Sequence, residues 1–210
     1  AAEAHFEQSA RATLETVNAY LAVIADQIKL HHGTLDKYIG DCVMAFWGAP
    51  VANERHAVAA CRAAVESQRA LHALNQQREE QNLELARGNE RRRAEGLPER
   101  PLLGLLSVGT GIHTGTATIG LMGSDAHILN YTAFGREVNL ASRLEGVSGH
   151  GRIVISGATY RELVRLEPAP GRAQLGLGGG ELLAAFRAGL EELALPLEAG
   201  FGHLTVCLGS

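Results

Sequence analysis

The sequence lacks several features that would assign it to a class of proteins at once. It has three cysteines in 210 residues, Cys42, Cys61 and Cys207, and none of them forms a CxxC pair. This spacing argues against a zinc site or a disulfide framework and favours a reducing compartment. No apolar run has the length of a membrane-spanning helix, and no signal peptide opens the chain. We therefore expect a soluble, cytoplasmic piece; whether a longer parent protein is membrane-anchored is left open.

Positive charge is also scarce. The formal net charge is -4, so the chain lacks the basic footprint of a nucleic-acid-binding protein. Hydrophobic residues make up 46% of the sequence, which is enough for a sizeable core. These two observations together favour a globular domain that binds no nucleic acid.

Helical and strand-like patterns alternate along the first 166 residues. The spacing of apolar residues predicts helices over 6–31, 54–85, 137–146 and 157–166, and strands over 35–39, 42–47, 105–114, 116–122 and 153–155. The charged stretch 87–101 is interpreted as an exposed loop. Hairpins interspersed with helices favour an α+β fold with a mostly antiparallel sheet over a doubly wound parallel sheet.

A Gly- and Pro-rich segment follows residue 167 and suggests a boundary. We expect residues 1–167 to form one domain and residues 168–210 to be a divergent or poorly ordered tail. Within that tail, 181–193 has the pattern of an amphipathic helix, and 201–210 is compatible with one strand.

The stretch LDKYIGDCVMAFWGAP, residues 35–50, places Lys37 and Asp41 around a glycine turn. Alternation of side chains predicts that Leu35, Lys37 and Ile39 share one face of the first strand, where a lysine needs an acceptor or a place at the rim. Asp41 at a hairpin tip presents the hard oxygen that Mg²⁺ prefers. Lys37 extending to solvent and Asp41 capping its own turn are equally open alternatives.

A second dense patch is NYTAFGREVNLASRLEG, residues 130–146. Asn139 and Arg143 lie one turn apart on one helix face, and Thr132 lies where the preceding strand ends. Arginine offers a rigid donor fork and asparagine a donor and an acceptor, which suits a phosphate and a ribose. The alternative is that Arg143 pairs with Glu137 or another surface acid, and that Asn139 is an ordinary surface residue.

GTGIHTG, residues 109–115, has neither the Walker pattern nor the spacing of a dinucleotide fingerprint. We interpret it as a strand whose glycines allow close packing of a helix or of a partner chain. His113 is interpreted as a structural histidine.

GTLDKYIGDCVMAFWGAP, followed by GIHTG, MGS and YTAFGREVNLASRLEG, resembles the catalytic domain of class III nucleotidyl cyclases. The resemblance covers about residues 13–166. It implies a ferredoxin-like α+β sheet of mostly antiparallel strands with helices packed on it, working as a head-to-tail homodimer or with a partner cyclase chain. The implied activity is conversion of ATP to 3′,5′-cyclic AMP and pyrophosphate, in signal transduction, under control of an upstream sensor domain in the parent protein.

The resemblance also implies a role for each matching residue. Asp41 matches one of two aspartates that hold two Mg²⁺ or Mn²⁺ ions per site. Lys37 and Thr132 match the residues that read the base. Asn139 matches the residue that orients the ribose, and Arg143 the residue that steadies the phosphates in the transition state. The metal-binding residues of one subunit would face the residues that contact the base, the ribose and the phosphates on its partner. The site would therefore exist only at the dimer interface.

Two departures from the family pattern bear on activity. The family's first strand, with the first metal aspartate, has no match before the helix at 6–31, and the C-terminal Lys-Gly segment has no match either. Loss of one carboxylate from a two-metal site would lower the rate about a thousandfold or more. Loss of the strand would expose a sheet edge.

Two alternatives to adenylate cyclase activity follow. The first is a non-catalytic regulatory or half-site domain that binds nucleotide or a partner cyclase chain. The second is a guanylate cyclase, although guanine readers in this family usually carry Glu and Cys at the positions of Lys37 and Thr132.

Overall fold

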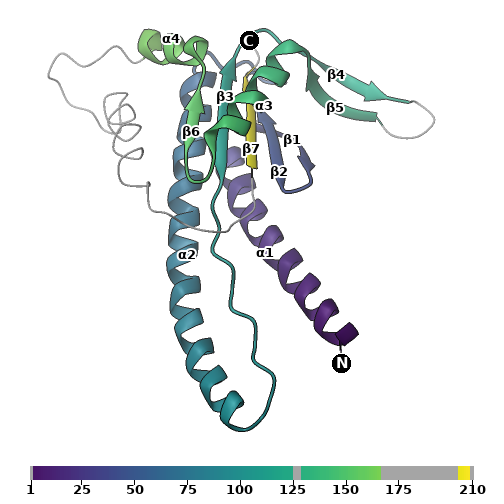
Figure 1. Cartoon of the computed structure of the whole chain (residues 1–210). Helices are drawn as coiled ribbons and strands as arrows, with labels where there is room; N and C mark the ends of the chain where they lie inside the picture. Colours follow the sequence, from purple (N-terminus) through teal and green to yellow (C-terminus); the bar gives the residue numbers. More distant parts are fainter. Residues whose placement is uncertain (1, 125–128, 167–202, 209–210) are drawn as a thin grey trace, which may run out of the picture.

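A computed structural model describes residues 2–124, 129–166 and 203–208, which form a five-stranded sheet, a separate two-stranded hairpin and four helices (Figure 1). The elements are α1 (Ala2–Leu30), β1 (Thr34–Ile39), β2 (Cys42–Phe46), α2 (His56–Ala94), β3 (Gly109–Thr114), β4 (Thr118–Gly123), β5 (Leu129–Phe134), α3 (Arg136–Ser148), β6 (Ile153–Ile155), α4 (Gly157–Leu166) and β7 (His203–Leu208). The predicted α+β class is confirmed. None of the described helices is both long enough and apolar enough to cross a membrane.

The main sheet has the strand order β1-β2-β7-β3-β6, and hairpin β4–β5 forms the second sheet. Hairpin β1–β2 is antiparallel, as its turn pattern predicts. Hairpin β4–β5 is antiparallel too, although the sequence analysis did not predict this pairing. The pairings β2–β7, β7–β3 and β3–β6 are parallel. The main sheet therefore has three parallel pairings and one antiparallel pairing, and is more parallel than the turn patterns alone indicate.

The space between β2 and β3 is filled by β7, so neither of these two strands is an edge of the described sheet. In the backbone register, His203 lies opposite both Cys42 and Gly109. The N–H and C=O groups of β2 and β3 thereby find partners, which an open edge would lack. The strand predicted within 201–210 is confirmed. The helix predicted at 181–193 lies outside the described residues, and the boundary at residue 167 stays a prediction.

Two apolar clusters cover the two faces of the sheet, and β2 contributes to both because its side chains alternate. Val43 and Ala45 belong to the larger cluster, formed mainly with α1 and α2. Met44 and Phe46 belong to the smaller cluster, formed with β5 and α3. Each side chain of hairpin β1–β2 therefore faces either the long helices or β5 and α3. The pairing register between β1 and β2 determines which of the two faces a β1 residue occupies.

Helix α1 ends where the sequence predicts, at the pair of histidines before Gly33. The Gly33 N–H donates to the Ile28 carbonyl at 2.8 Å, and the Trp47 indole N–H donates to the His31 carbonyl at 2.8 Å. A Cβ at Gly33 would lie 2.6 Å from the Trp47 ring, so glycine is needed for this close approach. The turn ties the C-terminal end of α1 to the end of β2.

Helix α2 is longer than the sequence predicts. It continues to Ala94, so the prediction of a loop is wrong for residues 87–94 and the non-helical connection begins at Glu95. The polar surface of this half of α2 is covered by residues 97–108, which we call the return segment and which run back along the helix to β3 (Figure 1). A solvated loop and a helix that packs against the return segment can have the same charged composition. Composition alone therefore could not distinguish the two for residues 87–94.

A ladder of amide side chains holds the return segment on α2. Asn75, Asn82 and Asn89 each donate to a main-chain carbonyl and accept from the N–H of the same residue. Their partners are Leu106 at 2.7 and 2.8 Å, Leu103 at 2.8 and 2.7 Å, and Arg100 at 2.8 and 2.7 Å, respectively. Gln68 extends the ladder by donating to the Val108 carbonyl at 2.6 Å.

The spacing of this ladder follows from backbone geometry. Its helix positions recur every seven residues, a rise of about 10.5 Å along an α-helix. The three asparagines bind every third residue of the return segment, and three extended residues span about 9–10 Å. The two repeats match in length, so one asparagine per two helical turns satisfies successive main-chain groups of the return segment.

Candidate active site

The turn between β1 and β2 holds Asp41 at a fixed place. Gly40 has φ of 64°, a left-handed conformation that glycine adopts without steric cost. The buried Tyr20 hydroxyl donates to the main-chain carbonyl of Asp41, and burial, with the charge of Asp41 nearby, raises the Tyr20 pKa. Burial also raises the pKa of the Cys42 thiol to about 11, so it stays protonated, 4.0 Å from Asp41 Oδ1. The Asp41 backbone is thus anchored, while its side chain stays partly exposed.

A β-bulge in β1 changes the direction of Lys37. Leu35 pairs with Ala45 and Lys37 with Met44, so Asp36 is an extra residue between two consecutive pairs. The prediction that Leu35 and Lys37 share a face is therefore wrong. Leu35 packs with the cluster under the long helices, whereas Lys37 takes the Met44 side, facing β5 and α3. A bulge re-aims the side chains that follow it, and here it brings a lysine to the opposite face.

Asp36 is the residue that sequence analysis missed. Its side chain is 0% exposed, and its Oδ2 accepts from the Thr132 hydroxyl at 2.6 Å and from the Ala133 N–H at 3.1 Å. Its Oδ1 lies 3.4 Å from Lys37 Nζ, and the Lys37 side chain is 40% exposed. A buried carboxylate is costly unless it is paired and hydrogen-bonded, and these three contacts meet that need. We call Asp36, Lys37 and Thr132 the Asp36 corner.

Lys37 and Thr132 are far apart in sequence, and one carboxylate brings them together. Lys37 thus has the charged acceptor that its sequence context called for. Thr132 is 1% exposed, so its hydroxyl lies below the surface in this state of the molecule. The signal in the sequence was the acid directly before the lysine in LDK, which alone does not reveal a contact with β5.

The glycines of β3 let α3 pack directly on the sheet, as predicted from GTGIHTG. A Cβ added to Gly111 would collide with the backbone of Ala141 and Glu145, and one added to Gly109 with Ser148 and Gly149. Helix α3 is thereby fixed against β3. It carries Asn139 and Arg143, both exposed, one turn apart.

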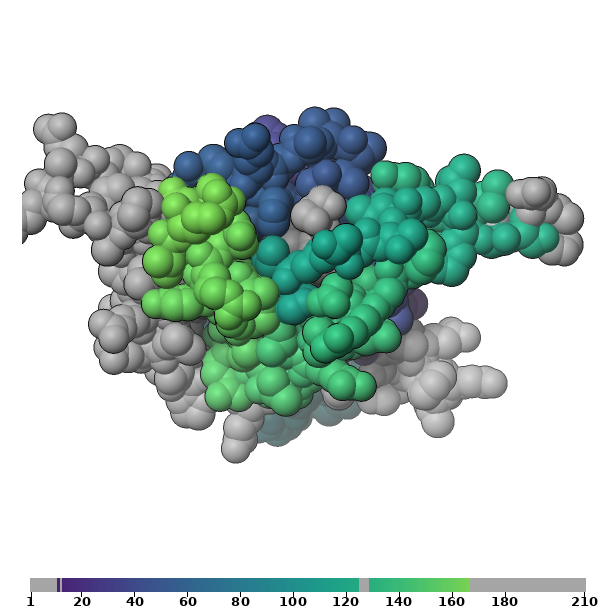
Figure 2. Space-filling model, turned by 90° about the horizontal axis from the view of Figure 1, so that it is seen from above, coloured from purple at the N-terminus to yellow at the C-terminus, as the bar shows by residue number. Residues whose placement is uncertain are grey.

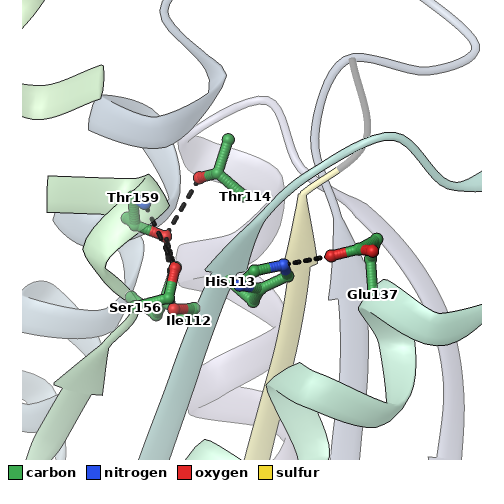
Figure 3. Close-up of polar contacts among 6 residues, drawn as sticks. All are labelled: Ile112, His113, Thr114, Glu137, Ser156 and Thr159. Carbon is green, nitrogen blue, oxygen red and sulfur yellow. Dashed lines mark hydrogen bonds and ion pairs between the residues drawn. The ribbon is translucent and has the colours of Figure 1, made fainter. Parts of the chain in front are cut away.

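His113, at the end of β3, is buried and contacts the Glu137 carboxylate through Nε2 (Figure 3). Glu137 therefore pairs with His113, and the described residues offer no ion pair between Glu137 and Arg143. This contact supports the interpretation of His113 as a structural histidine. It ties the first turn of α3 to the end of β3.

The same end of β3 also holds α4. Ser156 Oγ accepts from the Thr159 N–H at 3.1 Å as a cap of the helix, and Thr114 Oγ1 donates to Thr159 Oγ1 at 3.0 Å (Figure 3). Between α3 and α4 lies a cavity of about 570 Å³, lined among others by His113, Arg143 and Arg161. Seen from this end, hairpin β4–β5 projects on the side opposite α4 (Figure 2).

The described residues assemble the site in part. They bring Lys37 and Thr132 together, whereas no hydrogen bond or ion pair within the described ranges joins Asp41 to Asn139 or Arg143. Asp41 fits a divalent metal as a hard-oxygen ligand on an anchored turn. However, residues 2–124, 129–166 and 203–208 contain no group of three or more His, Cys, Asp or Glu that could enclose an ion. Asp41 alone therefore makes one ligand of a metal site that needs others.

Comparison with known proteins decides the family. The model of the family "Adenylate and Guanylate cyclase catalytic domain" matches residues 2–172. The chain belongs to this family. It is 37% identical over 157 residues to "Adenylate cyclase 1" of Rhizobium meliloti, a match that covers 72% of this chain and 20% of that relative's length.

Solved structures agree on the cyclase fold. The adenylyl cyclase CyaB from P. aeruginosa matches with a TM-score of 0.55 and 33% identity, over 74% of this chain and 70% of that one. The guanylyl cyclase Cya2 matches with a TM-score of 0.54 and 30% identity, over 79% and 71%. The chain is thus a class III cyclase domain with the α+β fold that the resemblance implied.

Proposed function

We propose that this cyclase domain converts ATP to 3′,5′-cyclic AMP and pyrophosphate. The observation that carries the proposal is the Asp36 corner. A lysine donor and a threonine hydroxyl, 95 positions apart in the chain, are held on one buried carboxylate. An arrangement of this kind offers one donor and one acceptor to the edge of a purine, as recognition of adenine requires.

The other matching residues take the roles that the family suggests. Asn139 orients the ribose and Arg143 stabilises the charge that develops on the phosphates. Their exposure on a helix fixed by Gly109 and Gly111 supports this, because a rigid mount preserves the alignment of donors. The cavity beside Arg143 offers room for part of a nucleotide.

We infer that the site is completed by a second cyclase chain. Asp41 has no polar contact with Asn139 or Arg143 within the described part of the chain, and a head-to-tail dimer would supply Asp41 from one subunit and the α3 pair from the other. Mg²⁺ or Mn²⁺, two ions per site in the intact family, would activate the ribose hydroxyl and neutralise the leaving pyrophosphate. Because ATP is the substrate, we place the domain in the cytoplasm, under a sensor domain of the parent protein.

Two other functions are favoured by single observations. Asp41 is the one carboxylate at the hairpin tip within the described residues, which favours a half-site domain that binds nucleotide without turnover. The 30% identity to a guanylyl cyclase structure favours GTP as substrate. We rank both below ATP cyclisation, because Lys37 and Thr132 are both present and joined.

The first experiment measures cyclic nucleotide formation by the purified chain with Mn²⁺ and ATP, and with GTP in parallel. We expect cyclic AMP, and a loss of about 100- to 1,000-fold in Arg143→Ala, the size of effect seen when a donor to transition-state charge is removed. Arg69→Ala is the matched control, since Arg69 is an exposed arginine paired with Glu66 on α2. Cyclic GMP as the main product would refute the proposed substrate.

Mixing variants then tests the shared site. Asp41→Ala and Arg143→Ala should each be inactive as single species. When they are mixed, half of the dimers are mixed and each mixed dimer keeps one intact site, so about one quarter of the wild-type activity should return. If nucleotide binds but no mixture or wild-type sample turns over, the half-site function replaces the proposed one.

A further inference from the structure

We propose that Asp36 is a positioning residue that sets the base preference of this site, by fixing the Thr132 hydroxyl as an acceptor beside the donor Lys37. The inference rests on the proposed function, in which Lys37 and Thr132 read the base. It adds a residue that touches no substrate and acts on base preference through the Thr132 hydroxyl. The physical basis is the direction of one hydrogen bond.

The Thr132 hydroxyl has one proton and two acceptors within reach. Asp36 Oδ2 lies 2.6 Å from Thr132 Oγ1, and the Ala133 carbonyl lies 3.3 Å from it. The shorter bond, to a carboxylate, is the stronger one, so the proton points to Asp36. Asp36 Oδ2 also accepts from the Ala133 N–H at 3.1 Å, which holds the carboxylate against β5. With its proton engaged, the hydroxyl can offer only lone pairs to a ligand.

An acceptor at this place distinguishes the two purines. Adenine carries an amine donor at position 6, whereas guanine carries a carbonyl acceptor there. A hydroxyl that cannot donate pairs with the amine of adenine and faces the carbonyl of guanine with an unpaired acceptor. Sites that leave such a polar group unpaired reject the wrong ligand strongly.

The second contact of Asp36 concerns Lys37. The bulge at Asp36 brings Lys37 to the β5 side of the sheet. Asp36 Oδ1 has no hydrogen-bond partner among the described residues and lies 3.4 Å from the Lys37 ammonium nitrogen. Thr132 is 1% exposed while the Lys37 side chain is 40% exposed. Entry of a base to Thr132 therefore needs side chains of the corner to move, and Lys37 is the exposed member that can turn toward the ligand.

The test measures binding of 3′-deoxy-ATP and 3′-deoxy-GTP to the 210-residue chain with Mn²⁺, since neither nucleotide can be cyclised. Wild type should prefer the adenine nucleotide. Asp36→Asn keeps the shape of the side chain but replaces the charged acceptor by a neutral one. Thr132 and the Ala133 N–H both bind Oδ2, so an amide oxygen in its place still accepts from Ala133 but holds the Thr132 proton only about half as strongly, and the hydroxyl can then turn its proton to a ligand. We expect the ratio of the two dissociation constants to fall about tenfold or more. Asp26→Asn, an exposed aspartate of α1, is the matched control and should keep the ratio.

A double-mutant cycle separates positioning from a general structural role. Thr132→Val removes the hydroxyl, so Asp36→Asn should cause no further change in base preference when it is added to Thr132→Val. In Thr132→Ser, which keeps a hydroxyl, Asp36→Asn should still lower the preference. A structural role alone would lower stability in every background and leave the ratio unchanged.

The outcomes are distinct. If wild type binds neither nucleotide, the proposed function fails and this inference with it. If wild type binds both nucleotides equally, or if Asp36→Asn folds and keeps the wild-type preference, only the assignment of Asp36 is overturned. If Asp36→Asn does not fold, Thr132→Val decides, because wild-type preference in that variant would show that the hydroxyl is not a reader.

Discussion

The return segment and the Asp36 corner are both held by polar side chains that bind groups on another element, but they are organised differently. Along α2, amides seven residues apart repeat the same two-bond contact at Leu106, Leu103 and Arg100. In the corner, the single carboxylate of Asp36 contacts the Lys37 ammonium group, the Thr132 hydroxyl and the Ala133 N–H. One region is redundant and the other depends on a single residue.

The difference has a consequence for how each region responds to change. Removing one rung of the ladder leaves the neighbouring rungs to hold the return segment. Removing Asp36 takes the shared carboxylate from Lys37 and Thr132 together and leaves the Ala133 N–H without its acceptor. Redundancy thus protects the long helix, whereas the geometry of the Asp36 corner depends on few atoms.

The largest loss of stability is expected at the contact of α3 with β3, where the closely packed backbones leave no room for an added side-chain atom. In Gly111→Ala the new Cβ would meet the backbone of Ala141 and Glu145. Backbone cannot turn aside as a flexible side chain can, so α3 has to shift, with a loss of about 3 kcal/mol or more in the free energy of unfolding. Asn139 and Arg143 would move with the helix. Urea unfolding and cyclase activity measure the two consequences.

Gly120→Ala is the control for this substitution. Gly120 lies on β4, and a Cβ there has no atom within 4 Å. We expect a change within about 0.5 kcal/mol and unaltered activity. Equal losses in both variants would mean that the effect belongs to glycine in strands and not to the packing of α3.

A smaller effect is expected in the redundant region. Asn75→Ala leaves the Leu106 N–H and C=O without their side-chain partner, and Asn75 is buried, so we expect a loss of about 2 kcal/mol. Asn89→Ala, near the tip, should cost less, because a frayed tip opens locally while the rungs nearer the sheet persist. Urea unfolding gives the totals, and hydrogen exchange of the Leu103 and Leu106 amides locates the loss.

Gln76→Ala is the matched control, since Gln76 is exposed and adjacent to the ladder. Cyclase activity should be retained in all three variants. Loss of activity in Asn89→Ala, at the end of α2 farthest from the sheet, would contradict the separation of the two regions.

Much of the fold could be predicted from sequence because its signals are local. The glycine turn at Gly40, the end of α1 before Gly33 and the close packing allowed by Gly109 and Gly111 are all confirmed. Each depends on backbone conformation or on the absence of a Cβ, which the residue type itself determines. The helix predicted over 137–146 is confirmed as α3, Arg136–Ser148.

The failures have a common physical cause. The polar half of α2 has a composition that also suits a loop, and only contact with the return segment stabilises it as a helix. The face occupied by Lys37 depends on the bulge at Asp36, and a shift of one residue sends every later side chain to the other face. The position of β7 depends on pairing with strands far away in sequence. Tertiary contact decides each of these features.

In the candidate site, too, the sequence predicted what depends on residue type and order but not what depends on tertiary contact. Its residue types and order were sufficient to recognise the family, and the family assignment is confirmed. The roles of Lys37, Asp41, Thr132, Asn139 and Arg143 stay predictions. Asp36 could not be found from spacing, because its importance depends on a contact between β1 and β5.

The smallest effect is expected from pH, at the junction where α1 meets the sheet between the two regions. Burial lowers the pKa of His31. The nearby charges of Arg62 and His32 lower this pKa further, whereas the charge of Glu66 raises it. The folded state therefore binds fewer protons than the unfolded state, in which histidine titrates near pH 6.5. The contribution of neutral, buried His31 to the free energy of unfolding is fully present above about pH 6.5. It is lost as the pH falls from about 6.5 toward the lower pKa of the folded state.

The free energy of unfolding should thus decline between about pH 7.5 and pH 5.5, and the decline should be shallower in His31→Gln. His56, whose pKa is also lowered by burial, contributes a further part, so the slope should not vanish. His72→Gln, at an exposed position of α2, should reproduce the wild-type slope. Urea unfolding at a series of pH values measures this. A slope unchanged by His31→Gln would mean that the burial of His31 has no role in anchoring α1, and that the junction is held by the Trp47 contact with the His31 carbonyl, which carries no proton linkage.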